Sequence, residues 1–136
     1  MIEKSKKSYE NYVCPNCFNQ LDKCMCITFP PYYMTWIDVG IQEHVRILNK
    51  KGYFTKFSCE GHSKYNRTYI VFVYDYGFGK KIKLPEGFNM NNLSIEHSYD
   101  KSVSDDEFAK QKEYYLNALL EWCNELPVNN NPHMMR

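Results

Sequence analysis

Residues 68–74, Thr68-Tyr69-Ile70-Val71-Phe72-Val73-Tyr74, set the architecture of this 136-residue chain. Every one of them is β-branched or aromatic, a composition that favours a β-strand. Because the apolar run has no charged interruption, we expect this strand in the centre of a sheet. Polar residues 63–67 precede it and Gly77-Phe78-Gly79 ends it, so turns are expected on both sides.

Three neighbouring segments are expected to pair with this strand. Tyr53–Ser58 is predicted as a strand just before it, and a weaker strand is predicted around Leu93–His97. Lys80–Leu84 is predicted as an edge strand, since lysines at the edge of a sheet discourage pairing with other sheets. Because short turns connect these segments, we expect an antiparallel sheet of three to four strands.

An apolar stripe at helical spacing predicts a helix before the sheet. The stripe consists of Ile37, Ile41, Val45 and Leu48. Thr35 is expected as the N-cap, with Asp38 answering its backbone N–H in a variant of the capping box. Gly52 is expected to end the helix, because glycine readily takes the left-handed conformation found there.

A second helix is predicted from Ser104, which forms a capping box with Glu107 and begins a helix that Pro127 stops. Its expected buried face contains Phe108, Tyr115, Leu119, Trp122 and Leu126. The fold class is therefore α+β, with both helices packed on one face of the sheet. We expect this domain over residues 32–127, a separate module over residues 1–31 and a flexible tail over residues 128–136.

Four of the six cysteines lie close together near the N-terminus, in Cys14-Pro15-Asn16-Cys17 and Cys24-Met25-Cys26. Tetrahedral Zn²⁺ is bound by four thiolates, and closely spaced cysteine pairs supply them. The predicted zinc ligands of a zinc-ribbon-like hairpin are Cys14, Cys17, Cys24 and Cys26. Cys24 and Cys26 point to opposite sides of an extended chain, so either a local bend brings both to the metal or another residue supplies one ligand, with His62 as the reserve.

Two disulfides are the alternative interpretation of the cysteine cluster, as in small secreted domains. The segment after Met1 has no apolar core of a secretory signal, which favours a reducing cytoplasm, bacterial or that of a phage-infected host. No apolar run has membrane-spanning length, so no membrane association is expected. Zinc is therefore the expected cofactor.

Charge is unevenly distributed along a chain whose net charge is only +1. Residues 43–83 carry nine Lys and Arg and three acidic residues, whereas residues 84–136 carry four basic and nine acidic residues. The basic middle can attract phosphate, although solvated faces of a helix and strands explain it equally well. Attraction between the two regions of different copies would allow a homodimer.

The loop after residue 57 concentrates reactive side chains, and we expect it to bind a ligand. Its candidate ligand-binding residues are Ser58, Cys59, Glu60, Gly61, His62, Lys64 and Arg67. Gly61 permits a backbone conformation that presents consecutive N–H groups to an anion. Lys64 and Arg67 follow within reach of a bound phosphate.

Other roles for this region stay open. Cys59 is a small buried hydrophobe in one interpretation and the nucleophile of a Cys59–His62 pair in another. Glu96-His97 is a second acid–imidazole pair that would join the site if its strand lay beside the loop. Phe78, between two glycines, is either a mobile ligand cap or an ordinary hairpin tip.

Residues 45–73 resemble the wybutosine-synthesis methyltransferase-like family. The matching residues are Leu48-Asn49, Gly52-Tyr53, Thr55, Ser58-Cys59-Glu60-Gly61 and Tyr69-Ile70-Val71-Phe72. The family has a basic residue where this chain has His62. The resemblance implies a similar local fold and a nucleotide-related ligand, but no cofactor-binding segment accompanies it that would imply methyl transfer. The layout is also similar to that of small proteins from phages and Gram-positive bacteria.

The sequence therefore predicts a zinc-containing protein that binds a phosphorylated ligand, such as a nucleotide, with sequestration of a signalling nucleotide as a phage-type role. One alternative is a zinc-ribbon protein that binds nucleic acid, which the near-neutral charge does not favour. A second is a small enzyme using Cys59 and His62, for which the sequence identifies no third orienting group. A third is a protein–protein adaptor whose interaction surface is the zinc hairpin.

Overall fold

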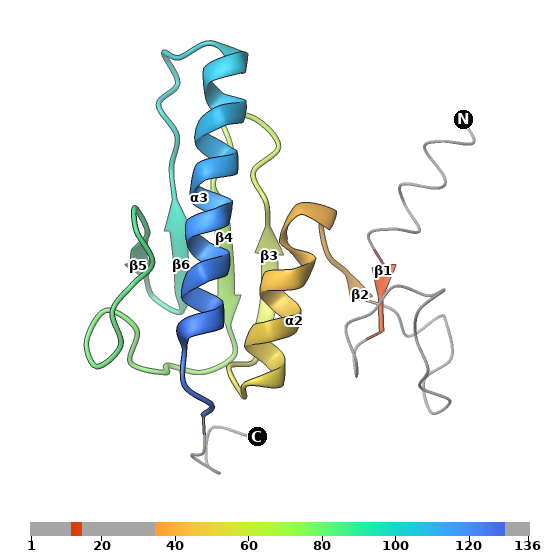
Figure 1. Cartoon of the computed structure of the whole chain (residues 1–136), viewed down its shortest axis with the longest axis vertical. Helices are drawn as coiled ribbons and strands as arrows, with labels where there is room; N and C mark the ends of the chain where they lie inside the picture. The colour runs from red at the N-terminus through yellow and green to blue at the C-terminus, as the bar shows by residue number, and fades with distance from the viewer. Residues whose placement is uncertain (1–11, 15–34, 130–136) are drawn as a thin grey trace.

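The computed structural model describes residues 12–14 and 35–129 of the chain. Their elements are β1 (Tyr12–Val13), β2 (Thr35–Trp36), the 3₁₀ turn η3 (Val39–Ile41), α2 (Gln42–Lys50), β3 (Thr55–Cys59), β4 (Thr68–Phe72), β5 (Asn89–Asn91), β6 (Ser94–His97) and α3 (Asp105–Glu125). β1 and β2 form a small antiparallel pair, and the other four strands form an antiparallel sheet in the order β3-β4-β6-β5 (Figure 1). The predicted α+β class is confirmed.

β4 lies inside the sheet, as its composition predicted, with β3 on one side and β6 on the other. Thr68, Ile70 and Phe72 are buried, whereas Tyr69 and Val71 between them are partly exposed. This alternation places one face of the strand in the core and the other towards solvent. The sheet is therefore covered on one side.

Both helices pack on that covered side, where α3 crosses the sheet beside α2 (Figure 1). The core residues include Ile70 and Phe72 from β4, Ile95 from β6, Val45 and Leu48 from α2, and Leu119, Trp122 and Cys123 from α3. The His44 side chain joins the helices, since its Nε2 lies 2.7 Å from the Leu116 carbonyl oxygen. The predicted placement of two helices on one face is thus confirmed.

The first helix begins later than predicted. Thr35 lies in β2 and is not its N-cap, and α2 starts at Gln42 after the 3₁₀ turn. Asp38 does not answer Thr35 either, because its carboxylate accepts the Glu60 N–H at 3.1 Å. The apolar stripe is nevertheless buried as predicted, and Gly52 follows the helix with a φ of 93°.

The predicted edge strand Lys80–Leu84 is wrong. The Gly77 carbonyl oxygen accepts the N–H groups of Lys80, Lys81 and Ile82, so the chain coils into a tight turn there. Phe78 is neither a mobile cap nor a hairpin tip, because its ring is 3% exposed and packs 5.1 Å from that of Trp122. The two edges of the sheet are β3 and β5, and Asn89–Asn91 of β5 was not among the predicted strands.

α3 begins and ends as predicted. The Ser104 hydroxyl accepts the Glu107 N–H at 3.1 Å, and Leu126 caps the other end. Lys51 Nζ donates to three carbonyl oxygens at that end, those of Cys123, Asn124 and Leu126, at 2.6–2.9 Å. A cation at this position complements the partial negative charge of a helix C-terminus.

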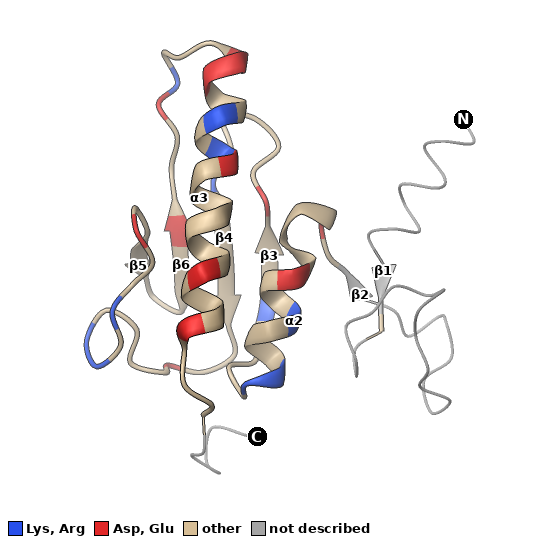
Figure 2. Ribbon diagram, viewed as in Figure 1, with Lys and Arg blue, Asp and Glu red and all other residues tan. Residues whose placement is uncertain are grey.

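Acidic side chains gather towards both ends of α3, whereas Lys and Arg mark α2 and the turn at residues 80–83 (Figure 2). No helix in residues 12–14 and 35–129 combines the length and the apolar character needed to cross a membrane. Of the predicted zinc ligands only Cys14 is described, and it is buried. Cys17, Cys24 and Cys26 lie outside the described residues, so the zinc hairpin stays a prediction.

Candidate functional site

A hollow of about 540 Å³ lies at one end of the four-stranded sheet. Cys59 at the end of β3 pairs with Tyr69, and Thr68 at the start of β4 pairs with His97 at the end of β6. The loops at residues 60–67 and 98–104 therefore leave the sheet at the same end. The residues that line the hollow are Cys59, His62, Lys64, Tyr65, Asn66, Arg67, Tyr69, Ser98, Tyr99 and Lys101.

The lining is cationic and aromatic. It includes Lys64, Arg67 and Lys101, and none of the described residues that line it is acidic. The Arg67 guanidinium lies 6.0 Å from the ring centre of Tyr69 and 3.8 Å from a carboxylate oxygen of Glu96. Because that ion pair is long and half of the Arg67 side chain is exposed, the guanidinium remains accessible to a second anion.

Lys64 serves mainly to hold the hollow together. Its Nζ donates to the Val103 carbonyl oxygen at 2.6 Å, and the side chain is only 17% exposed. The contact ties the loop after β3 to the loop after β6. An ammonium that is fixed in this way adds positive potential to the hollow without having to move.

The Glu60 side chain does not line the hollow and instead contacts α3 and the segment before α2. Its carboxylate accepts the Gly40 N–H at 2.9 Å and the Lys112 ammonium at 2.6 Å. Burial alone would raise the pKa of this carboxyl, but the hydrogen bonds from Lys112 and Gly40 outweigh it, so the pKa lies below its usual value. Glu60 thus cross-links its loop to the segment before α2 and to α3.

Gly61 has a φ of 88°, and a Cβ added there would lie 2.8 Å from Thr68 Oγ1. The Thr68 hydroxyl donates to the Glu60 carbonyl oxygen at 2.8 Å and lies 2.6 Å from the Tyr99 hydroxyl. The Gly61 N–H points at Cys59 Sγ, 3.4 Å away. With the Glu60 N–H also engaged by Asp38, the expected backbone cradle is used internally, so side chains would have to hold an anion.

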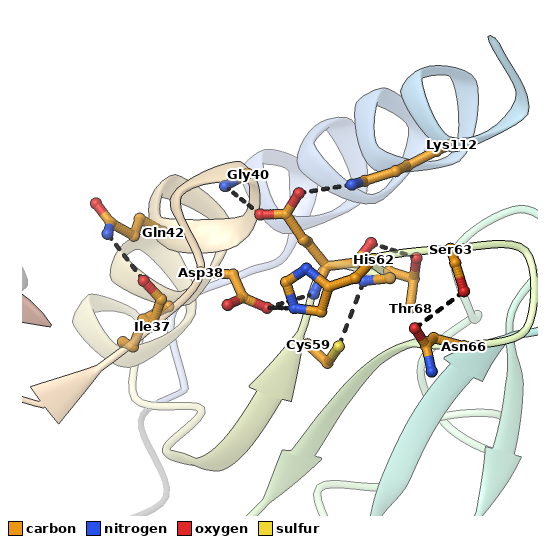
Figure 3. A network of polar contacts seen from close by, with 12 residues as sticks. Ile37, Asp38, Gly40, Gln42, Cys59, His62, Ser63, Asn66, Thr68 and Lys112 are labelled. Carbon is orange, nitrogen blue, oxygen red and sulfur yellow. Dashed lines mark hydrogen bonds and ion pairs between the residues drawn. The ribbon is translucent and has the colours of Figure 1, made fainter. Parts of the chain in front are cut away.

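Three side chains that can bind a metal meet beside the hollow: Asp38, Cys59 and His62 (Figure 3). One ligand atom from each lies within 4.8 Å of the other two. His62 Nε2 is 3.0 Å from Asp38 Oδ2, and Asp38 is buried whereas His62 is exposed. The set combines one sulfur, one nitrogen and one oxygen.

The Cys59 thiol is not activated as a nucleophile. Burial raises its pKa, and the negative charges of Asp38 and Glu60 raise it further, against the lowering effect of the Gly61 N–H. Catalytic thiols have depressed pKa values because the thiolate is the reactive form. The raised pKa therefore does not favour Cys59 as the nucleophile of a Cys59–His62 pair.

Of the residues predicted to bind a ligand, Cys59, His62, Lys64 and Arg67 line the hollow. The other three support it from outside. Ser58 pairs with Ile70 within the sheet, while Glu60 and Gly61 hold the loop in shape.

Sequence reasoning missed two important members of the site. Lys101 comes from the loop after β6, and its position in a polar run carried no signal. Asp38 has the sequence position of a helix-cap residue, but its carboxylate lies beside Cys59 and His62. Of the second acid–imidazole pair, only Glu96 approaches the site, through Arg67. His97 stacks on the Tyr115 ring 3.8 Å away, with Nδ1 2.7 Å from the Gly87 carbonyl oxygen.

No family model, no curated protein and no solved structure matches this chain. The resemblance of residues 45–73 to the wybutosine-synthesis methyltransferase-like family therefore stays a prediction.

Proposed function

We propose that this protein binds a phosphorylated small molecule of nucleotide size in the hollow at the end of the sheet. One observation carries the proposal: a space of about 540 Å³ is lined by Lys64, Arg67 and Lys101 without an acidic lining residue among those described. Binding sites for small molecules commonly have volumes of ~300–1,000 Å³. The space thus suits a mononucleotide or a similar phosphorylated compound.

The cationic side chains would divide the recognition of phosphate among them. Arg67 offers a planar guanidinium that can donate two parallel hydrogen bonds to one phosphate group. Lys101 is exposed and can approach the same group, whereas Lys64 adds positive potential from a fixed position. These contacts account for charge recognition but not for the identity of the rest of the ligand.

Tyrosines supply the apolar part of the site. Tyr65 is 66% exposed, so its ring is accessible to a ligand, and Tyr69 forms part of the same lining. Stacking of a nucleobase on an aromatic ring contributes ~1–3 kcal/mol. A nucleotide would therefore use both features of the hollow, while inorganic phosphate would use only the cations.

The proposal is tested by thermal unfolding with nucleosides, nucleotides and inorganic phosphate. A nucleotide at about 100 times its Kd should add about 2.7 kcal/mol to the free energy of unfolding, and the matching nucleoside should add far less. Arg67→Gln and Lys101→Gln should weaken this stabilisation. Lys83→Gln is the matched control, since it removes an exposed lysine of the basic region outside the hollow.

Equal loss in Lys83→Gln would mean that general charge, and not this hollow, attracts the ligand. No stabilisation by any phosphorylated compound would overturn the proposal. If single-stranded oligonucleotides alone stabilise the protein, with affinity falling steeply as salt rises, the nucleic-acid alternative replaces it.

Tight binding without turnover would fit sequestration of a signalling nucleotide in a bacterial or phage-infected cytoplasm. Cys59 is a free cysteine, which suits a reducing cytoplasm. The raised pKa of this thiol supports a binding role over a thiol-dependent enzyme.

A further inference from the structure

We propose that Asp38, Cys59 and His62 form a transition-metal site of the zinc type, placed at the wall of the hollow. The three residues come from separate places: the turn before α2, the end of β3 and the loop that follows it. Their ligand atoms lie within 4.8 Å of one another, and no other such group of three exists among residues 12–14 and 35–129.

The chemistry of the ligand set selects the kind of metal. Zn²⁺ accepts thiolate sulfur, imidazole nitrogen and carboxylate oxygen, whereas Mg²⁺ and Ca²⁺ prefer oxygen alone. A thiolate and an imidazole in one set therefore favour zinc or a related divalent ion of the first transition row. Binding releases the Cys59 thiol proton to solvent, so the complex holds the thiolate.

The distances require only a small adjustment. Zinc binds sulfur at about 2.3 Å and nitrogen or oxygen at about 2.0–2.2 Å, so ligand atoms around it lie roughly 3.5 Å apart. His62 Nε2 and Asp38 Oδ2 are already 3.0 Å apart. The His62 side chain is 60% exposed and lies in a loop, so it can move towards an ion without disturbing the core.

Backbone hydrogen bonds already orient two of the three proposed ligands, Asp38 and Cys59. The Glu60 N–H donates to Asp38 Oδ2 at 3.1 Å, and the Gly61 N–H lies 3.4 Å from Cys59 Sγ. Outer partners of this kind fix metal ligands in most protein metal sites, and removing them commonly costs ~10–100-fold in affinity. Here successive backbone groups serve both ligands, and the Glu60 side chain anchors that backbone to Gly40 and Lys112.

The position of the ion connects the site to the hollow, because Cys59 and His62 also belong to its lining. Three protein ligands leave a fourth tetrahedral position for water or for an exogenous ligand, as in zinc sites that act on substrates. A phosphate oxygen is the group that the cationic lining would bring there. This last step depends on the proposed function, whereas the metal site itself depends only on its own geometry.

A cobalt titration of the full chain, stripped of metal and kept reduced, tests the site. Tetrahedral Co²⁺ bound through sulfur absorbs in the near ultraviolet by thiolate-to-metal charge transfer and in the visible by d–d transitions. We expect Asp38→Asn, Cys59→Ser and His62→Gln each to lose one equivalent of bound Co²⁺ per chain relative to the unaltered protein. His97→Gln is the matched control and should lose none.

The N-terminal cysteines could bind Co²⁺ as well, and Asp38→Asn separates the two sites. If His62 instead completed an N-terminal site, His62→Gln would lose cobalt but Asp38→Asn would not, which would overturn the proposal. Unchanged stoichiometry in all three variants, or no binding by the unaltered protein, would overturn it too.

A second measurement needs no variant that has to fold. In the unaltered protein loaded with ¹¹³Cd²⁺, we expect scalar couplings from cadmium to the Cys59 β-protons and to the His62 imidazole. Cadmium signals coupled only to other cysteines would contradict the site. Since both measurements use the metal alone, failure of nucleotide binding would leave the metal site standing, and failure of metal binding would leave the nucleotide proposal to its own test.

Discussion

Gly61 shows how one residue can determine the shape of the candidate site. Its φ of 88° lies in the left-handed region, and a Cβ there would come within 2.8 Å of Thr68 Oγ1, which donates a hydrogen bond to the Glu60 carbonyl oxygen. Backbone strain and a steric contact therefore act at the same position.

Replacement of this glycine should be more costly than replacement of a comparable one. We expect Gly61→Ala to lower the free energy of unfolding by roughly 2–3 kcal/mol, because it combines left-handed strain with displacement of Thr68. Gly77→Ala is the control, since its φ is 83° but a Cβ there would meet nothing closer than 3.5 Å. Urea denaturation measures both, and equal losses would show that the Thr68 contact has no energetic weight.

His44 links α2 to α3, and its contribution to the stability of the fold depends on pH. Its Nε2–H donates to the Leu116 carbonyl oxygen, and its Nδ1 is buried with no hydrogen-bond partner among the described residues. Burial lowers the pKa of the imidazole and outweighs the opposing effect of the Leu116 bond. The folded protein therefore holds this side chain in its neutral form.

Acidification should destabilise the fold through this side chain. Below a pH of about 6.5 the unfolded chain takes up a proton on His44 that the folded chain resists, so stability is complete above that pH and falls below it. We expect urea denaturation at pH 7.5 and 5.5 to show a larger loss in the unaltered protein than in His44→Gln, which has a donor but does not titrate. Equal losses would assign the pH dependence to other groups.

At the scale of elements, the hydrophobic pattern predicted the strands and helices that bury apolar side chains. It did not predict the elements whose conformation depends on tertiary contacts. β4 and α3 were predictable because their composition and capping signals agree with their final surroundings. β5 was missed since Asn89–Asn91 has low strand propensity and pairs through a turn in which Asn92 has a φ of 57°. The strand predicted at Lys80–Leu84 does not form, although its sequence suits a strand. The Gly77 carbonyl oxygen accepts backbone N–H groups of this segment, which holds it in a turn.

The candidate site follows the same division. Cys59, His62, Lys64 and Arg67 are close in the chain, so local chemistry was enough to select them. Asp38 and Lys101 reach the site only through the packing of α2 and the pairing of β6 with β4. Residue spacing in the sequence does not predict these tertiary contacts.

The contact between α3 and the loop gives a prediction at this scale. Lys112→Met should lower the free energy of unfolding by about 1–3 kcal/mol, because it leaves the largely buried Glu60 carboxylate with only the Gly40 N–H. Lys110→Met is the control on the same helix, where the lysine is exposed. Chemical denaturation compares the two, and Glu60→Gln in the Lys112→Met background should recover part of the loss if the unpaired charge is its cause.

At the scale of the whole molecule, a sheet covered on one face supports a site at its end, where the loops after β3 and β6 meet. The longer helix borders this region through Lys112 and reaches Lys51 at its opposite end, so one element joins the site to the far side of the domain. The basic hollow borders the acidic start of α3, where Lys64 Nζ lies 4.0 Å from a carboxylate oxygen of Asp105. Local potential and not net charge would then attract an anion.

The attachment of Glu60 to both Gly40 and Lys112 has a kinetic consequence. A loop that is tied from two sides loses its conformational freedom when the chain folds, so a visiting molecule would not have to order it on arrival. The association rate of a ligand with such a preformed site is set by diffusion and electrostatic steering. Differences in affinity between competing ligands would then appear mainly in their dissociation rates.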